Sequence, residues 1–167
     1  YLQQRPKNLR KNLGRYLRRL EQDSQQVELK LIRQPADIHA AVCRYGALES
    51  AGWKGQQGTA LDPNNSQTLF YSEVLCSLAQ QEQVLIAELY ADNQLLASRL
   101  CIYTAQRFVI LKTTYDESQK HYAPGRLLLY KLLEYLFSAG LSKTIDFYTN
   151  TTADQMEWST HARLFYN

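Results

Sequence analysis

Residues 107–140 read RFVILKTTYDESQKHYAPGRLLLYKLLEYLFSAG, and this stretch decides the fold that the sequence predicts. Its first residues are rich in β-branched and aromatic side chains, as strands are. A polar loop follows and ends at Pro124-Gly125, and a leucine-rich helix then runs to Gly140, a typical helix stop. Because a strand that leads into a helix start is a common way to bind phosphorylated cofactors, we expect a phosphate-binding turn here.

The start of this helix offers backbone N–H groups without intrahelical partners and a partial positive charge. Pro124 suits the first helical position, where its missing N–H costs nothing, and Gly125 lets a ligand approach the backbone closely. Lys120 and Arg126 add positive charge on either side. A diphosphate would match this turn; the alternative is that Pro124-Gly125 forms only a strand-to-helix turn.

The segment KHYAPG at 120–125 resembles the Gln/Arg-x-x-Gly-x-Gly/Ala signature of the GNAT acetyltransferases, in which this loop wraps the diphosphate of coenzyme A. Lys120 stands where the family has Arg or Gln, Ala123 replaces the first glycine, and Pro124 removes one backbone donor. The resemblance implies acetyl-CoA or another acyl-CoA as co-substrate. It also implies a cofactor site made of Leu111, Thr113, Lys120, Tyr122, Ala123, Gly125, Arg126 and Leu127.

Length and composition are those of one globular domain, with 167 residues, 45% of them apolar and 21% charged. No apolar run approaches the ~20 residues that cross a bilayer, and nothing at the amino end resembles a signal peptide, so we expect a cytoplasmic protein. Cys43, Cys76 and Cys101 are odd in number and widely spaced, and the histidines are scattered. Neither disulfides nor a metal site are therefore expected.

The amino-terminal segment is strongly basic, with seven cations and no acid among its first twenty residues. Leucines at positions 9, 13, 17 and 20 recur at helical spacing, so residues 1–22 are expected to form an amphipathic helix with a basic outer face. This helix could pack on its own or a neighbouring domain, or contact nucleic acid, an acidic membrane surface or an anionic glycan. Its few aromatic residues make nucleic acid an unlikely partner.

The periodicity of residues 23–167 predicts one α/β (α+β) domain. The expected strands are 27–33, 84–90, 95–104, 107–115 and 144–148, and the expected helices are 35–50, 68–80 and 127–139. Because short turns join the strands between 84 and 115, these should form an antiparallel meander. The element order resembles that of the GNAT acyl-CoA N-acyltransferase fold, a mixed, mostly antiparallel sheet flanked by helices.

Blocks along almost the entire chain resemble the CelD-like branch of this family, which is linked to polysaccharide biosynthesis. In chain order they are RPKNLRKNL at 5–13, Glu49, WKG at 53–55, GTA at 58–60, FY at 70–71, YDE at 115–117, YAPGRLL at 122–128, DF at 146–147 and Trp158. Members of this branch often carry two such folds in tandem, and the chain begins with Tyr1 rather than Met. We therefore expect a missing amino-terminal domain, or a second copy of the chain, as a partner.

The carboxyl-terminal end departs from the family pattern. Asn150, Asp154 and Gln155 stand where the family usually has Gly, Tyr and Lys, and no tyrosine lies between Tyr148 and Tyr166. In related acyltransferases a tyrosine in this region protonates the departing thiolate. These departures keep open a second interpretation, in which the chain is a non-catalytic binding domain with the same fold.

Three carboxylates are the candidate catalytic residues, because an amine acceptor with a pKa near ~10 must lose a proton during acyl transfer. Asp116 follows the last meander strand, Glu49 ends the helix at 35–50, and Asp146 lies on the returning strand. Asp116 could instead end its strand through turn hydrogen bonds, Glu49 could pair with Lys54, and Asp146 could be a buried structural carboxylate. Backbone amides at 111–113 are expected to stabilise the oxyanion.

Trp53, Lys54 and Tyr71 are the candidate acceptor-binding residues, because an indole, an ammonium and a phenol together can hold a sugar or a carboxylated acceptor. Trp53 could equally be core and Lys54 plain surface. The sequence therefore predicts acyl transfer to an amine or hydroxyl of a small-molecule or glycan acceptor, in polysaccharide or cell-envelope biosynthesis. A third interpretation is an aminoacyl-tRNA-dependent transferase like the Fem-type enzymes, which share this fold; the basic helix would then contact RNA.

Overall fold

A computed structural model describes residues 1–52, 66–141, 144–148 and 152–162 of the chain. A five-stranded sheet lies at its centre, in the spatial order β1-β2-β3-β4-β5. Its strands are β1 (Val27–Ile32), β2 (Val84–Ala91), β3 (Gln94–Tyr103), β4 (Arg107–Tyr115) and β5 (Thr144–Phe147). The pairs from β1 to β4 are antiparallel and β5 is parallel to β4, which confirms the expected mixed, mostly antiparallel sheet.

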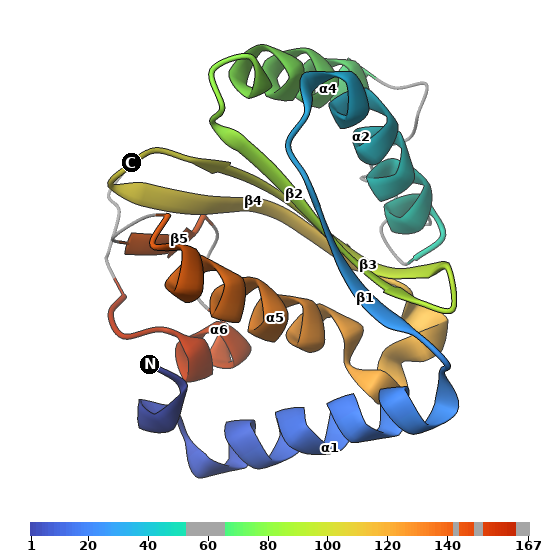
Figure 1. Ribbon diagram of the computed structural model, residues 1–167, viewed down its shortest axis with the longest axis vertical. Coiled ribbons are helices and arrows are strands. Elements are labelled where there is room, and N and C mark those ends of the chain that lie inside the picture. The colour runs from blue at the N-terminus through green and yellow to red at the C-terminus, as the bar shows by residue number, and fades with distance from the viewer. Residues whose placement is uncertain (53–65, 142–143, 149–151, 163–167) are drawn as a thin grey trace.

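Helices cover both faces of the sheet (Figure 1). On one face lie α2 (Pro35–Ser50) and α4 (Ser66–Ala79); on the other lie α5 (Pro124–Ala139), α1 (Lys7–Asp23) outside it, and the short α6 (Ala153–Trp158). The chain also forms two short 3-10 segments, η1 (Leu2–Gln4) and η2 (Glu117–Tyr122). Every expected strand and helix is present; η2 and α6 were not expected.

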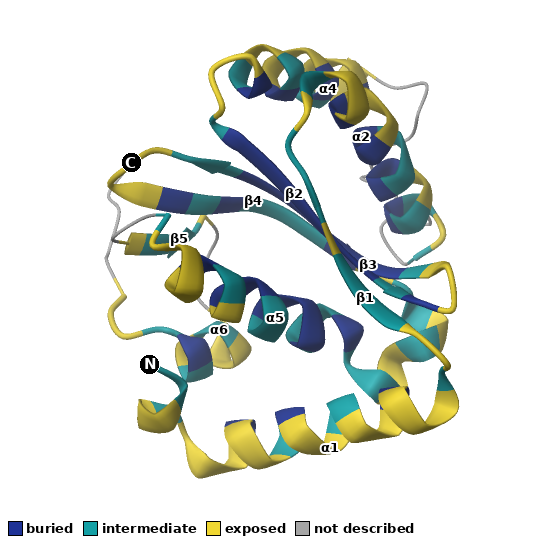
Figure 2. Cartoon of the chain, in the orientation of Figure 1, coloured by how far each residue is buried: buried dark blue, intermediate teal, exposed yellow. Residues whose placement is uncertain are grey.

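Each face of the sheet has its own apolar core, because successive side chains of a strand point to opposite faces. On β2, Leu85 and Leu89 pack in the core around α5, whereas Val84 and Ile86 pack in the core with α2 and α4. Figure 2 shows β2 and β3 buried along most of their length. Coverage on both faces explains why β2 reads as a continuous apolar run rather than an alternating one.

The basic helix α1 packs on the domain through its leucines. Leu9, Leu13 and Leu20 are buried in the α5 core, and the cations of the helix face outward. The helix begins at Lys7 rather than at residue 1, with Pro6 at its N-cap. None of the helices in the described ranges is long and apolar enough to cross a membrane. Within the same ranges no group of His, Cys, Asp and Glu could hold a metal ion.

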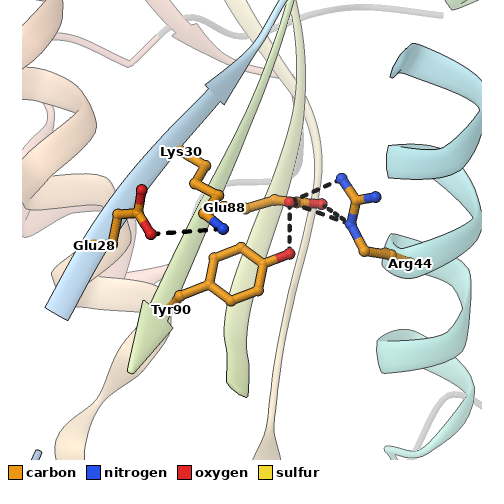
Figure 3. Close-up of polar contacts among 5 residues, drawn as sticks. All are labelled: Glu28, Lys30, Arg44, Glu88 and Tyr90. Carbon is orange, nitrogen blue, oxygen red and sulfur yellow. Dashed lines mark hydrogen bonds and ion pairs between the residues drawn. The ribbon is translucent and has the colours of Figure 1, made fainter. Parts of the chain in front are cut away.

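A buried carboxylate joins β2 to α2 (Figure 3). Glu88 is fully buried, and its two oxygens accept hydrogen bonds from Nε and Nη2 of Arg44, both at 3.0 Å. The hydroxyl of Tyr90 donates a further bond to Glu88 at 2.9 Å, and the ammonium of Lys30 lies 4.4 Å from the centre of the Tyr90 ring. This network holds α2 against the sheet through Arg44, which lies five residues before Glu49 on the same helix.

Candidate functional site

A β-bulge interrupts β4 at Leu111. Leu100 of β3 pairs with Lys112, and the next residue, Cys101, pairs with Ile110, so Leu111 is the extra residue. Bulges bend a strand and increase its twist. Within the ranges that the structure describes, the pairing of β4 with β5 covers residues 107–110, so it ends where the bulge begins.

The part of β4 beyond the bulge has an open edge. Among the described residues, 111–115 have no ladder partner on the side of β5. Unpaired strand edges present backbone N–H and C=O groups that a ligand can use. Leu111 and Thr113, two residues of the expected cofactor site, lie in this segment.

The loop between β4 and α5 ends in a left-handed residue. Ala123 has φ 51° and ψ 54°, and α5 begins at Pro124, the expected first position. No side chain caps this helix start. The amides of Arg126 and Leu127 both donate to the carbonyl of Ala123, at 2.9 and 3.1 Å. The turn therefore presents backbone at the positive end of a helix, as anion-binding turns do.

Replacing Ala123 with glycine is expected to stabilise the protein. A left-handed conformation costs a residue with a Cβ about 1–2 kcal/mol, whereas glycine adopts it freely. Because glycine also loses more backbone entropy on folding, the net gain should be about 0.5–1 kcal/mol. Urea denaturation measures this difference in the free energy of unfolding, and a lower stability of Ala123→Gly would contradict the strain.

Contacts from α1 hold the loop from outside. Nη1 of Arg19 donates to the carbonyl of His121 at 3.3 Å, and the hydroxyl of Tyr122 donates to Oδ2 of Asp23 at 2.8 Å. The Tyr122 side chain, which was expected to bind cofactor, is thus engaged with the end of α1. The basic helix has a direct structural role beside the turn.

Contacts from the sheet hold the turn from beneath. A Cβ on Gly125 would lie 3.4 Å from Cδ1 of Tyr115, and the carbonyl of Gly125 accepts a hydrogen bond from Nη2 of Arg99 at 3.2 Å. Lys120 is exposed, whereas the side chain of Leu127 is buried in the core. The side chain of Leu127 is therefore not available to a ligand, and its amide already donates to the carbonyl of Ala123.

Arg126, an expected ligand of the diphosphate, pairs with α6. Its Nη2 contacts Oδ1 of Asp154 and lies 3.2 Å from Oε2 of Glu157. The two carboxylates neutralise the cation next to the turn. Asp154 is one of the residues that differ from the expected family pattern, so the ion pair with Arg126 depends on this difference.

Glu49, Tyr45, Lys112 and Tyr71 form a cluster at the carboxyl-terminal end of α2. Glu49 is 1% exposed and accepts a hydrogen bond from the hydroxyl of Tyr45 at 3.0 Å. Nζ of Lys112, the residue after the bulge, lies 3.8 Å from Oε2 of Glu49 and 5.4 Å from the centre of the Tyr71 ring. The structure thus brings together two expected site residues, Glu49 and Tyr71, with two that were not expected, Tyr45 and Lys112.

Both phenols of this cluster stay protonated at neutral pH. Burial, with the neighbouring charge of Glu49, raises the pKa of Tyr45 far above its ordinary value. Burial also raises the pKa of Tyr71, with contributions from Glu49 and Tyr148. The cluster therefore contains a buried carboxylate and two protonated phenols, of which Tyr45 donates a hydrogen bond to the carboxylate.

The other two candidate carboxylates have structural partners. Oδ1 of Asp116 accepts from the amide and the hydroxyl of Ser118 at 2.9 and 2.6 Å, and Oδ2 accepts from Gln94 at 2.9 Å. Asp146 on the edge strand β5 lies 3.8 Å from Nη1 of Arg107. Asp116 thus forms turn hydrogen bonds after its strand, which is the structural role that the sequence offered as the alternative to catalysis. Trp53 and Lys54 lie outside the described residues.

The five-stranded mixed sheet with helices on both faces has the architecture of the GNAT acetyltransferase fold. The family model for the acetyltransferase (GNAT) domain matches residues 7–157, so the chain belongs to this family. Domains of this family use acyl-CoA as co-substrate. No curated protein matches the chain.

Solved structures of acetyltransferases share the fold at low identity. An aminoglycoside acetyltransferase from an uncultured soil metagenomic sample, in complex with sisomicin, has a TM-score of 0.54 at 9% identity, over 84% of this chain and 95% of that chain. A ribosomal-protein-alanine N-acetyltransferase from Brucella melitensis biovar Abortus 2308 has a TM-score of 0.52 at 11% identity, over 85% of this chain and 95% of that chain. A GNAT family acetyltransferase from Staphylococcus aureus has a TM-score of 0.53 at 13% identity, over 84% of this chain and 97% of that chain.

Proposed function

We propose that the chain is an acyltransferase that binds acyl-CoA along the open edge of β4, with the diphosphate at the start of α5. The observation that carries this proposal is the end of β4–β5 pairing at the bulge of Leu111. The free edge can hydrogen-bond the amides of the cofactor's pantetheine arm, and backbone N–H groups at 111–113 can hold the thioester oxygen as it becomes an oxyanion. The amide of Gly125, at the positive end of α5, would bind the diphosphate, with Lys120 at the rim. The amides of Ala123 and Leu127 instead donate to the carbonyls of Lys120 and Ala123 and shape the turn.

Glu49 is the proposed proton acceptor. The acceptor's amine or hydroxyl attacks the thioester carbonyl carbon, its proton passes to Glu49 directly or through water, and the C–S bond breaks to release the coenzyme A thiolate. The ordinary pKa of a thiol is about 8.5, so the thiolate can leave near neutral pH and take its proton from solvent. The chemistry therefore does not require a tyrosine between Tyr148 and Tyr166.

The proposed acceptor is an amine- or hydroxyl-bearing small molecule or glycan of polysaccharide or cell-envelope biosynthesis, acylated in the cytoplasm from acetyl-CoA. The resemblance to the CelD-like branch supports this class, and the sisomicin complex is an example of an amine-bearing sugar on the same fold. Tyr71, beside Lys112 and Glu49, is in a position to contact such an acceptor. Trp53 and Lys54 remain proposed partners of Tyr71.

A second candidate function is a non-catalytic domain that keeps the fold. The ion pairs of Arg126 with Asp154 and Glu157 favour it, because they compete with a diphosphate for the guanidinium. Under this alternative the protein would bind coenzyme A weakly and would not turn over.

Blocking the turn at Gly125 separates these functions. Acetyl-CoA at a hundred times its dissociation constant should stabilise the wild-type protein by about 2.7 kcal/mol. Gly125→Trp should abolish that gain, because an indole starting against the Tyr115 ring would displace the backbone of the turn. Differential scanning fluorimetry with acetyl-CoA, longer acyl-CoAs and charged tRNA measures the gain.

Gly14→Trp is the matched control, because nothing lies within 4 Å of a Cβ at this glycine on α1. A wild-type protein that no acyl-CoA stabilises would overturn the proposal. Stabilisation by charged tRNA alone would favour a Fem-type transferase instead.

A further inference from the structure

Arg99 is a buried cation in the middle of β3. It is 7% exposed, on a strand that is covered on both faces. A buried charge lowers stability unless it is paired and hydrogen-bonded. In the described residues Arg99 forms one hydrogen bond, to the carbonyl of Gly125, and its Nε is buried without a partner.

The position of Arg99 links the two halves of the proposed cofactor site. It is the register partner of Thr113, so its side chain leaves the sheet on the same face as that of Thr113, just beyond the bulge. Its guanidinium then reaches the first turn of α5 at Gly125. The side chain therefore runs beneath the site, from β3 beside Thr113 to the helix start.

Of the two arginines at this turn, Arg99 and Arg126, Arg99 has the charge with less compensation from carboxylates. Arg126 is paired with Asp154 and Glu157, whereas no carboxylate of the described ranges is in salt-bridge contact with Arg99. Burial lowers the pKa of Arg99 to about 10, against the smaller opposing effects of Cys101, Tyr45 and Asp154. The guanidinium is still charged at neutral pH, and an anion at the turn would be attracted to it through a medium of low polarity.

We propose that Arg99 is a positioning residue of the cofactor-binding turn, which holds Gly125 from beneath and supplies the buried positive charge that the diphosphate of coenzyme A neutralises. This inference rests on the proposed function. It means that a residue of β3, outside the loop at 120–125, contributes to the affinity for coenzyme A. It also accounts for a buried charge on a strand that has no carboxylate partner within the described part of the chain.

The test compares Arg99→Met with Arg99→Lys, using calorimetric dissociation constants for coenzyme A and for pantetheine, which lacks the diphosphate. Arg99→Met should weaken coenzyme A binding by about ten- to a hundredfold and leave pantetheine binding unchanged. Without ligand this variant should melt at or above the wild-type temperature, because an apolar side chain replaces a buried charge. Arg99→Lys, which keeps the charge, should restore most of the affinity.

Cys101→Ala is the matched control, two residues along the same strand on the same core, and it should lower the melting temperature without changing the ratio of the two constants. The inference is overturned if Arg99→Met leaves that ratio unchanged while the wild-type protein binds coenzyme A. A wild-type protein that binds no coenzyme A overturns the proposed function and the inference with it. If Arg99→Met does not fold, Arg99→Gln, which keeps a donor but no charge, gives the same comparison.

Discussion

Glu49→Gln is expected to lower the turnover number of acyl transfer by about two to four orders of magnitude. The amide cannot accept the acceptor's proton, but it has the same shape, and its oxygen can still accept the hydrogen bond of Tyr45. The affinity for acetyl-CoA should stay near the wild-type value, because Glu49 lies on α2 and not at the α5 turn. Release of free thiol at saturating acetyl-CoA, with a panel of amine and hydroxyl acceptors, measures the turnover number.

Three further carboxylate variants locate the proton acceptor. Glu134→Gln changes an exposed carboxylate on α5 that bonds Tyr130, and it should leave the turnover number unchanged. Asp116→Asn should reduce stability more than turnover, because Asp116 accepts three hydrogen bonds in its turn. If Glu49→Gln turns over normally and Asp146→Asn does not, the proton acceptor is on β5 and the assignment of Glu49 is wrong.

Local patterns in the sequence were enough to predict the sheet. Residues 84–115 contain three strands joined by short turns, and neighbouring strands of this kind pair with little choice of topology. The bulge at Leu111 could not be predicted, because it exists only in the register of β4 against β3 and no residue type marks it. The short α6 was missed because its six residues have no long apolar period.

The site could be predicted only where its residues are neighbours in sequence. The turn at 120–125 is one continuous loop, so its Pro-Gly step was visible. The pairing of Arg126 with α6 depends on tertiary packing, and it changes what the side chain can bind. Two features of the sequence could have pointed to further site residues. The four-residue spacing of Tyr45 and Glu49 places both on one helix face, and Arg99 is the one charged residue in the stretch 95–102.

Arg44→Met is expected to cause the largest loss of stability, about 3 kcal/mol in the free energy of unfolding. The substitution removes all three guanidinium hydrogen bonds from Glu88, which is fully buried and would keep the bond from Tyr90. The Arg44 side chain is 41% exposed, so water can reach the carboxylate from that side. The loss of stability should therefore lie at the lower end of the range of about 3–5 kcal/mol for breaking a buried ion pair. Urea denaturation followed by circular dichroism measures the difference.

A double-mutant cycle shows whether this loss comes from the unpaired carboxylate. Glu88→Met in the Arg44→Met background removes the buried charge, so the double variant should recover most of the stability, with a coupling energy of about 2 kcal/mol. Lys30→Met is the control, because the exposed pair of Lys30 with Glu28 should contribute less than about 1 kcal/mol. If the double variant is no more stable than Arg44→Met, the arginine stabilises α2 through its packing rather than its charge. The network in Figure 3 would then position the helix of Glu49 by shape alone.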